Sequence, residues 1–165
     1  GTAPQALMED WKALATNSFN WGGLLGTLLT VPIARVFGRR TMFALYFAGS
    51  AAAVLATFGL NLDPETRLRM YFLIGLTVFG VFGSFTYYLP ELFPTRLRGT
   101  GAGFCYNIGR VIAAAGPFLV GEIASQGAKG TGTAISTLFY VGFIPALGLL
   151  LVPLIVETHG KKLED

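Results

Sequence analysis

The chain has 165 residues, of which 53 % are apolar and only 13 % are charged, and its mean hydropathy is +0.59. A soluble domain of this length needs fewer apolar residues to fill its core, so the composition excludes an ordinary soluble domain. The formal net charge is +3, but Lys and Arg stand at the ends of apolar runs instead of forming one patch, which argues against a nucleic-acid partner.

Taken in chain order, the sequence first shows a polar segment and then a series of apolar runs. The opening segment, Gly1 to Asn20, has no basic n-region and no cleavage site, so we expect the interior of a longer protein and not a signal peptide. Five runs have about the 20 residues that a helix needs to cross a hydrocarbon core about 30 Å thick. The predicted spans are residues 16–36, 41–60, 69–89, 100–123 and 133–156.

These runs are apolar on nearly all sides and do not alternate in polarity as the strands of a membrane barrel do. Inside lipid, backbone groups of such a run must bond within a helix. The sequence therefore predicts an all-α, polytopic transmembrane helix bundle that lies in the lipid bilayer.

The loops between the runs differ in their content of Lys and Arg, which are enriched on the cytoplasmic side. One set of loops carries seven such residues and the other set carries four. The side with seven is predicted to be cytoplasmic. We therefore expect a multi-pass protein of the cell membrane (plasma or inner membrane) whose carboxyl terminus lies in the cytoplasm. The two sets are Arg35, Arg39, Arg40, Arg96, Arg98, Lys161 and Lys162 against Lys12, Arg67, Arg69 and Lys129.

Glycines recur at four-residue spacing within the runs, in the pairs Gly22 with Gly26 and Gly99 with Gly103. Such pairs predict close approach of helix backbones. The stretch from Gly99 to Gly103 is followed by Phe104, so the dinucleotide-binding fingerprint is broken, and we expect helix packing there.

Three short motifs follow predicted spans at the cytoplasmic side. Gly38-Arg39-Arg40 follows the first span, with Arg35 and Val36 in front of it. The stretch from Pro90 to Gly101, PELFPTRLRGTG, follows the third span. Its prolines favour the end of one helix, Glu91 is placed to pair with arginines, and Thr100 is a candidate cap for the next helix. Glu157-Thr158-His159-Gly160 follows the last span.

Together these motifs resemble those of the sugar-porter-like branch of the major facilitator superfamily. The first is similar to the end of a D-R-x-G-R-R loop, although Arg35 and Val36 replace its Asp and Arg, and the last is similar to P-E-T-K-G with Val156 and His159 replacing Pro and Lys. The resemblance implies that residues 1–165 form part of the carboxyl-terminal transmembrane domain, helices eight to twelve. It also implies alternating access around a central site, with the amino-terminal half of the transporter as a missing partner.

Placing an arginine at the centre of a membrane helix costs about 2.5–3.5 kcal/mol of free energy on insertion scales. A charged residue there is therefore a candidate functional residue. Arg110 stands near the middle of the fourth span, and Asn107 shares its helical face. Arg110 is therefore a candidate ligand for an anionic substrate; the alternative is a permanent ion pair with an acid in the missing half. Further candidate substrate-binding residues, for which packing or interfacial anchoring is the alternative, are Ser84, Tyr87, Tyr88, Asn20 and Trp21.

A second group of residues is expected to form a charge network that gates transport at the cytoplasmic face. Its members are Glu91, Arg96, Arg98, Arg39, Arg40 and Glu157. The single Cys105 and single His159 provide neither an internal disulfide nor a Cys/His metal site, and no metal or cofactor is expected.

The function that fits these features is secondary active transport of a small polar metabolite, coupled to an ion for which the proton is the first choice. An organic acid or acidic sugar is the favoured substrate class because Arg110 suits a carboxylate. The alternatives are a sugar transporter of the same superfamily and a non-transporting receptor or scaffold. An enzyme is not expected, since the spans lack clustered His, Asp or Glu residues.

Overall fold

The computed structural model describes residues 3–126 and 131–160, and the regular elements in these ranges are all helices. The prediction of an all-α chain is confirmed. In chain order the elements are α1 (Ala3–Phe37), α2 (Arg39–Gly59), α3 (Pro64–Arg69), α4 (Tyr71–Glu91), α5 (Arg98–Gln126), α6 (Thr131–Val141), α7 (Phe143–Leu151) and the short 3-10 helix η1 (Val152–Leu154).

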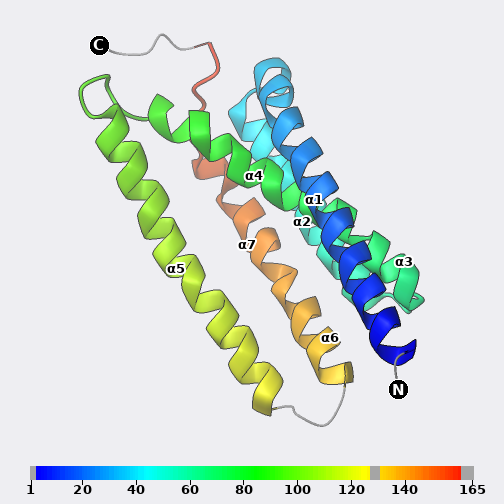
Figure 1. The fold of residues 1–165 in the computed structure, drawn as a ribbon. Coiled ribbons are helices and arrows are strands. Elements are labelled where there is room, and N and C mark those ends of the chain that lie inside the picture. The colour runs from blue at the N-terminus through cyan, green and yellow to red at the C-terminus, as the bar shows by residue number, and fades with distance from the viewer. Residues whose placement is uncertain (1–2, 127–130, 161–165) are drawn as a thin grey trace.

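The long helices lie roughly side by side, and α2 has the most neighbouring elements, whereas the most extensive packing is that of α1 along α4 (Figure 1). Helix α1 packs along α4, α2 packs against α4, α6 and α7, and α5 borders α4 and α6. The connections from α1 to α2 and from α4 to α5, together with the segment after η1, gather at one end of the molecule. We call this the charged end, because Arg39, Glu91 and Glu157 lie there.

Glycines allow α1 and α4 to lie against each other. A Cβ atom at Gly22 would overlap the carbonyl oxygen of Phe72, and one at Gly26 would overlap that of Leu76. From the other helix, a Cβ at Gly75 would overlap the carbonyl oxygen of Phe19. The close approach predicted from Gly22 and Gly26 is therefore confirmed.

The second predicted pair behaves differently. No atom of the described residues lies within 4 Å of a Cβ built at Gly99 or at Gly103, apart from their own helix and chain neighbours. Within the described part of the chain no other helix packs on this pair, so its packing against another helix stays a prediction. A four-residue spacing places small residues on one face of a helix. The arrangement of the helices decides whether another helix packs on that face.

A tyrosine joins three helices at the centre of the bundle. Tyr46 of α2 is 4 % exposed and lies across Gly80 of α4, where a Cβ would overlap its ring. Its hydroxyl donates a hydrogen bond of 2.9 Å to the carbonyl oxygen of Gly26 in α1. Tyr46 belongs to the main buried cluster, whose members are Ala34, Met42, Phe43, Tyr46, Val81 and Tyr88.

Helices α1, α2, α5 and α6 begin earlier than the apolar runs predicted. Helix α1 begins at Ala3, thirteen residues before the run that starts at residue 16, because Gln5, Leu7 and Glu9 favour helix although they are exposed. Helix α5 begins at Arg98, so Thr100 lies inside it and is not its cap. An apolar run predicts only the part of a helix that can lie in the hydrocarbon core. The helix itself can extend further into polar sequence.

The last predicted span, 133–156, is not one continuous helix. It is divided at Gly142 into α6 and α7, and it ends in η1. Pro145 lacks the N–H that would bond Val141, and its ring opposes that carbonyl, which favours a break one turn earlier. The Gly142 N–H instead bonds the carbonyl of Phe139 at 3.0 Å, as in a tighter turn.

By length and composition, three segments of the described chain qualify as membrane spans: Arg39–Gly59, Pro64–Glu91 and Ile135–Leu154. Helices α1 and α5 are long but are not among them. The five spans and their boundaries stay predictions.

Candidate functional site

Charged and polar side chains from α2, α4 and the segment after η1 meet at the charged end. We call Arg39, Arg40, Glu91, Glu157 and Thr158 the charge cluster. These residues are far apart in sequence. Helix α2 runs antiparallel to α4, so its first residues meet the end of α4 and the segment after η1 (Figure 1).

An ion pair between α2 and α4 forms the centre of the cluster. Arg39 donates from Nε to Glu91 Oε2 at 3.1 Å and from Nη2 to Glu91 Oε1 at 2.6 Å. Thr158 adds a third hydrogen bond, from its hydroxyl to Glu91 Oε2 at 2.6 Å. The Arg39 and Glu91 side chains are only 15 % and 17 % exposed. This two-point geometry fixes both the distance and the orientation of the two helices.

Glu157 caps the amino terminus of α2. Its carboxylate accepts hydrogen bonds from the backbone N–H groups of Arg39 at 2.9 Å, Arg40 at 3.0 Å and His159 at 3.0 Å. A carboxylate at this position also matches the positive end of the helix dipole. Gly38, just before the helix, has φ +86°, and a Cβ there would lie 2.9 Å from Glu157 Oε2.

These contacts change the pKa of the Glu157 carboxyl. Desolvation raises the pKa of its carboxyl, but the backbone hydrogen bonds from Arg40, Arg39 and His159 outweigh it, and the pKa lies below its usual value. Glu157 is therefore held as a carboxylate and binds the carboxyl-terminal segment to α2.

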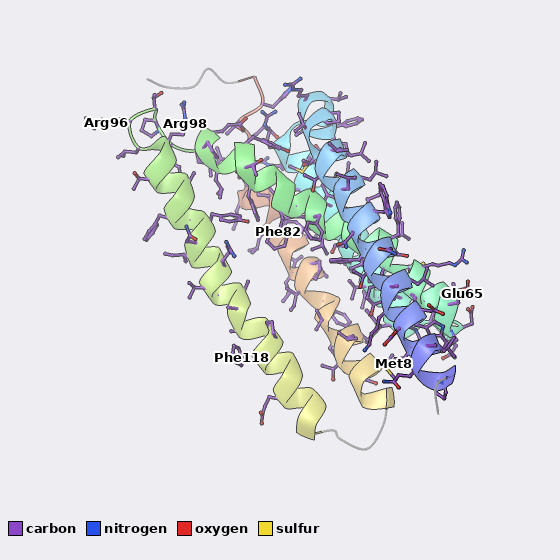
Figure 2. The ribbon with its side chains drawn as sticks, in the orientation of Figure 1. Met8, Glu65, Phe82, Arg96, Arg98 and Phe118 are labelled. Carbon is purple, nitrogen blue, oxygen red and sulfur yellow. The ribbon has the colours of Figure 1, made fainter. Side chains whose placement is uncertain are left out.

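The two arginines after α4 differ from each other, and Figure 2 shows both near the start of α5. Arg98 donates from Nε to the carbonyl oxygen of Pro90 at 3.2 Å, while its Nη2 is buried without a hydrogen-bond partner among the described residues. Arg96 is exposed and forms no ion pair with another described residue. Neither contacts Glu91 through an ion pair, so the structure does not join all the predicted network members.

Three predicted substrate-binding residues of α4 are engaged inside the bundle. Ser84 is 0 % exposed and donates to the carbonyl of Val81 in its own helix at 2.6 Å. Tyr88 is 7 % exposed and donates to the carbonyl of Val156 at 3.0 Å. The Tyr87 hydroxyl lies 3.0 Å from the Thr30 hydroxyl. The Arg39 guanidinium lies 5.8 Å from the Tyr87 ring centroid.

Arg110 lines an open cavity of about 290 Å³ between α4 and α5, which we call the Arg110 cavity. Its guanidinium lies 5.8 Å from the ring centroid of Tyr106, one turn earlier on α5. Phe82, labelled on α4 in Figure 2, and Phe85 add aromatic walls from the facing helix. The remaining lining residues are Leu89, Cys105, Gly109 and Ala113.

The other predicted ligands lie apart from this cavity. Asn107 is exposed, and its amide donates to the Gly103 carbonyl of its own helix at 2.8 Å. Asn20 and Trp21 are exposed on α1, with Trp21 at 66 %. The structure therefore does not gather the predicted substrate-binding residues into one site.

Sequence reasoning missed the residues that surround Arg110 and one that completes the charge cluster. Tyr106 stands four residues before Arg110, a spacing that places them on the same face of a helix and could have indicated a pair. Thr158 lies in the motif after the last predicted span, but its hydrogen bond to Glu91 could not be inferred from that motif. Phe82 and Phe85 gave no local signal, because their relation to Arg110 depends on how α4 meets α5.

Comparison with known proteins bears on the family of the chain. The sequence profile of the family described as "Sugar (and other) transporter" matches residues 8–165. The chain belongs to this family of the major facilitator superfamily. It is accordingly part of a multi-pass membrane protein of a transporter family.

Curated relatives of the family include transporters of different organisms. The cis,cis-muconate transport protein of Acinetobacter baylyi is 35 % identical over 127 residues, which are 75 % of this chain and 30 % of the relative. The probable 4-methylmuconolactone transporter of Cupriavidus pinatubonensis is 30 % identical over 146 residues, 88 % of this chain and 33 % of the relative. Human solute carrier family 22 member 11 is 30 % identical over 142 residues, 86 % of this chain and 25 % of the relative.

The chain thus spans about a third of the length of the first two relatives. No solved structure matches it significantly.

Proposed function

We propose that this chain is part of a secondary active transporter that moves a small organic acid across the membrane by alternating access, with the acid held in the Arg110 cavity. The observation that carries the proposal is a lone guanidinium set among aromatic and aliphatic walls between α4 and α5. Family membership supports transport, and the relatives that handle muconate and 4-methylmuconolactone support this choice of substrate.

The chemistry of the cavity favours an acid over a neutral sugar. A guanidinium can donate two parallel hydrogen bonds to a carboxylate, and aromatic walls fit a flat or unsaturated carbon skeleton. A hexose presents many hydroxyl groups that need partners once they leave water. Apart from Arg110, the side chains of the lining that carry a hydrogen-bonding group are the Tyr106 hydroxyl and the weakly bonding Cys105 thiol.

The charge cluster serves, in this proposal, as a lock at one membrane face. It would hold α2, α4 and the carboxyl-terminal segment together in one conformation and be remade in the other. Arg98 extends the lock: its buried Nη2 needs an acceptor, which we place in the amino-terminal half of the transporter, outside this chain. Arg96, which is exposed in the connection between α4 and α5, contributes positive charge at the same membrane face.

The seven-to-four distribution of Lys and Arg supports a cytoplasmic position for the charged end, and with it a cytoplasmic carboxyl terminus in the cell membrane. Five spans, helices eight to twelve of the full transporter, complete the proposed topology. Transport is coupled to protons and requires neither a cofactor nor enzymatic chemistry.

Uptake by proteoliposomes containing the full-length transporter tests the proposal. We expect uptake of labelled muconate and no competition from an excess of glucose. Arg110→Lys should weaken binding by about tenfold, because the ammonium keeps the charge and loses the two-point geometry, and Arg110→Ala should abolish measurable binding. Muconate uptake that persists unchanged in Arg110→Ala would remove this residue from the site.

A structural ion pair is the competing role for Arg110. If an acid in the amino-terminal half pairs permanently with Arg110, removing both partners should restore binding that each single substitution destroys. A double variant that binds normally would show that Arg110 is structural, while transport itself would remain supported by uptake.

A further inference from the structure

Tyr87 of α4 connects the end of α1 with the central ion pair of the charge cluster. Its hydroxyl lies 3.0 Å from the Thr30 hydroxyl and donates to the Thr30 carbonyl oxygen at 3.3 Å. Thr30 is 1 % exposed, so water competes little for these contacts. The polar end of Tyr87 is therefore attached to α1.

The ring of Tyr87 faces Arg39, the arginine that pairs with Glu91. The guanidinium carbon of Arg39 lies 5.8 Å from the ring centroid, within the range of a cation–π interaction. All three guanidinium nitrogens already donate hydrogen bonds: Nε and Nη2 to Glu91, and Nη1 to the Ala34 carbonyl oxygen at 3.1 Å. Guanidinium N–H groups point in the plane of the group, so its faces remain free for an aromatic ring.

Two pairs of residues, each spaced by one helical turn, build this junction. Thr30 and Ala34 share one face of α1, and Tyr87 and Glu91 share one face of α4. Arg39 comes from α2 and contacts Ala34, Tyr87 and Glu91. One guanidinium thus joins three helices, and Tyr87 links α1 to α4 beside it.

We propose that Tyr87 is a positioning residue of the lock at the charged end: it holds the Arg39 guanidinium in the orientation that pairs with Glu91, and it couples the end of α1 to that pair. The inference rests on the role in transport proposed above for the charge cluster. A cavity of about 310 Å³ borders Arg39, Tyr87 and Glu91. Without the aromatic ring, the guanidinium has space to turn into this cavity and lose the two-point geometry.

This role differs from the substrate contact that the sequence predicted for Tyr87. Its hydroxyl already has a partner on α1, and its ring faces Arg39. Among the described residues, those of α4 that line the Arg110 cavity do not include Tyr87. A substrate bound by the Tyr87 hydroxyl would have to displace Thr30.

The first test needs no substrate. Thermal unfolding of the full-length transporter is compared for Tyr87→Leu, Arg39→Gln and the double variant. If the ring acts through the guanidinium, Tyr87→Leu should lower the unfolding midpoint by clearly less when Arg39 is already Gln than in the unmodified protein. Equal shifts in the two backgrounds would overturn the proposal.

The link to α1 is tested by a second cycle with milder changes. Tyr87→Phe and Thr30→Val each remove one hydroxyl and keep the size of the side chain. Together they should lower the unfolding midpoint by less than the sum of their separate shifts. Additive shifts would contradict the coupling between α1 and Tyr87, and this cycle decides the matter even if Tyr87→Leu does not fold.

A third measurement separates a positioning role from a substrate contact. With labelled muconate, Tyr87→Leu should slow initial uptake by about threefold to fivefold and leave the equilibrium affinity within a few-fold, while Tyr87→Phe, which keeps the ring, restores most of the rate. Tyr140→Leu, at a tyrosine of α6 that is 68 % exposed, is the matched control and should change neither quantity.

Two results of this measurement have different meanings. A folded Tyr87→Leu protein that no longer binds muconate would make Tyr87 a substrate ligand and overturn the positioning role. Absence of muconate uptake by the unmodified transporter would contradict the proposed substrate instead, and the two unfolding cycles would still decide the role of Tyr87.

Discussion

At the scale of single residues, Glu91 shows how one carboxylate can connect separate parts of the chain. It accepts two hydrogen bonds from Arg39 of α2 and one from Thr158 after η1, while its own backbone ends α4. Each hydrogen bond to a charged group contributes about 1.5–3 kcal/mol, and the pair is largely shielded from water. A change at this one residue should therefore alter how the helices are held at the charged end.

We expect Glu91→Gln to slow transport by about tenfold or more while leaving substrate affinity within a few-fold. The amide keeps the shape but loses the charge and one acceptor, which shifts the balance between conformations without touching the Arg110 cavity. Initial uptake rates and equilibrium binding on the full-length transporter measure the two effects separately. Glu65→Gln, at an exposed pair with Arg69, is the control, and a Glu91→Gln protein that folds but no longer binds substrate would contradict a gating role.

Glu157 gives the same end of the molecule a dependence on pH. Its folded-state pKa lies below the ordinary glutamate value of 4.5, so its contribution to stability is complete above that value and disappears as the pH falls through the lowered pKa. The reason is that a protonated carboxyl cannot accept all three backbone hydrogen bonds as a carboxylate does.

The expected result is that Glu157→Gln lowers the free energy of unfolding by about 1 kcal/mol at neutral pH and by progressively less below pH 4.5. Thermal unfolding of the full-length protein and of the variant, followed from pH 7 downward, gives this difference. A difference that stays constant across the range would show that the charge of Glu157 has no part in capping α2.

At the scale of helices, glycines set how closely α1 and α4 approach. At Gly26 an added methyl group would meet the backbone of α4, which cannot move aside as a flexible side chain can. At Gly103 of α5 the same methyl group would meet no other described residue. The two positions thus offer the same substitution in opposite environments.

Gly26→Ala should destabilise the full-length transporter by about 1–3 kcal/mol, since the two backbones must separate. Gly103→Ala should be neutral or stabilise by a few tenths of a kcal/mol, because alanine favours helix more than glycine does. Unfolding midpoints measured in the same detergent compare them. If Gly103→Ala is the more damaging change, a helix from outside this chain packs closely on α5.

At the scale of the whole molecule, the helices place the charged end and α3 at opposite ends of the bundle (Figure 1). Positions at helix ends and in loops are exposed at both ends of the bundle, among them Phe37, the last residue of α1, at 61 %, and Asn61. The only cysteine of the chain, Cys105, is exposed as well and has to be replaced before cysteine labelling.

In a Cys105→Ser background, we expect an impermeant maleimide to label Asn61→Cys on intact cells. Phe37→Cys, and a cysteine placed at Lys162 in the tail, should react only after the membrane is made permeable, since both lie on the side with more Lys and Arg. Labelling of Phe37→Cys and the tail position from outside would reverse the proposed orientation.

Sequence alone determined the features that depend on local chemistry. Long apolar runs require helices, because lipid offers no partner to the backbone, and the motif around Glu91 and the four-residue spacing of Gly22 and Gly26 pointed to a charged contact and to helix packing. Charge at loop ends and the residues after the last run also indicated the family to which the chain belongs.

Only the tertiary structure decided which of these features meet. It joined Glu91 to Arg39 and Thr158, left Arg96 outside the ion pair, and used Ser84 and Tyr88 for internal hydrogen bonds. It also placed Phe82 and Arg110 in the lining of one cavity, an arrangement of two helices that no local pattern encodes. The physical reason is that periodicity fixes the face of a helix on which a residue lies, whereas packing among helices fixes what that face meets.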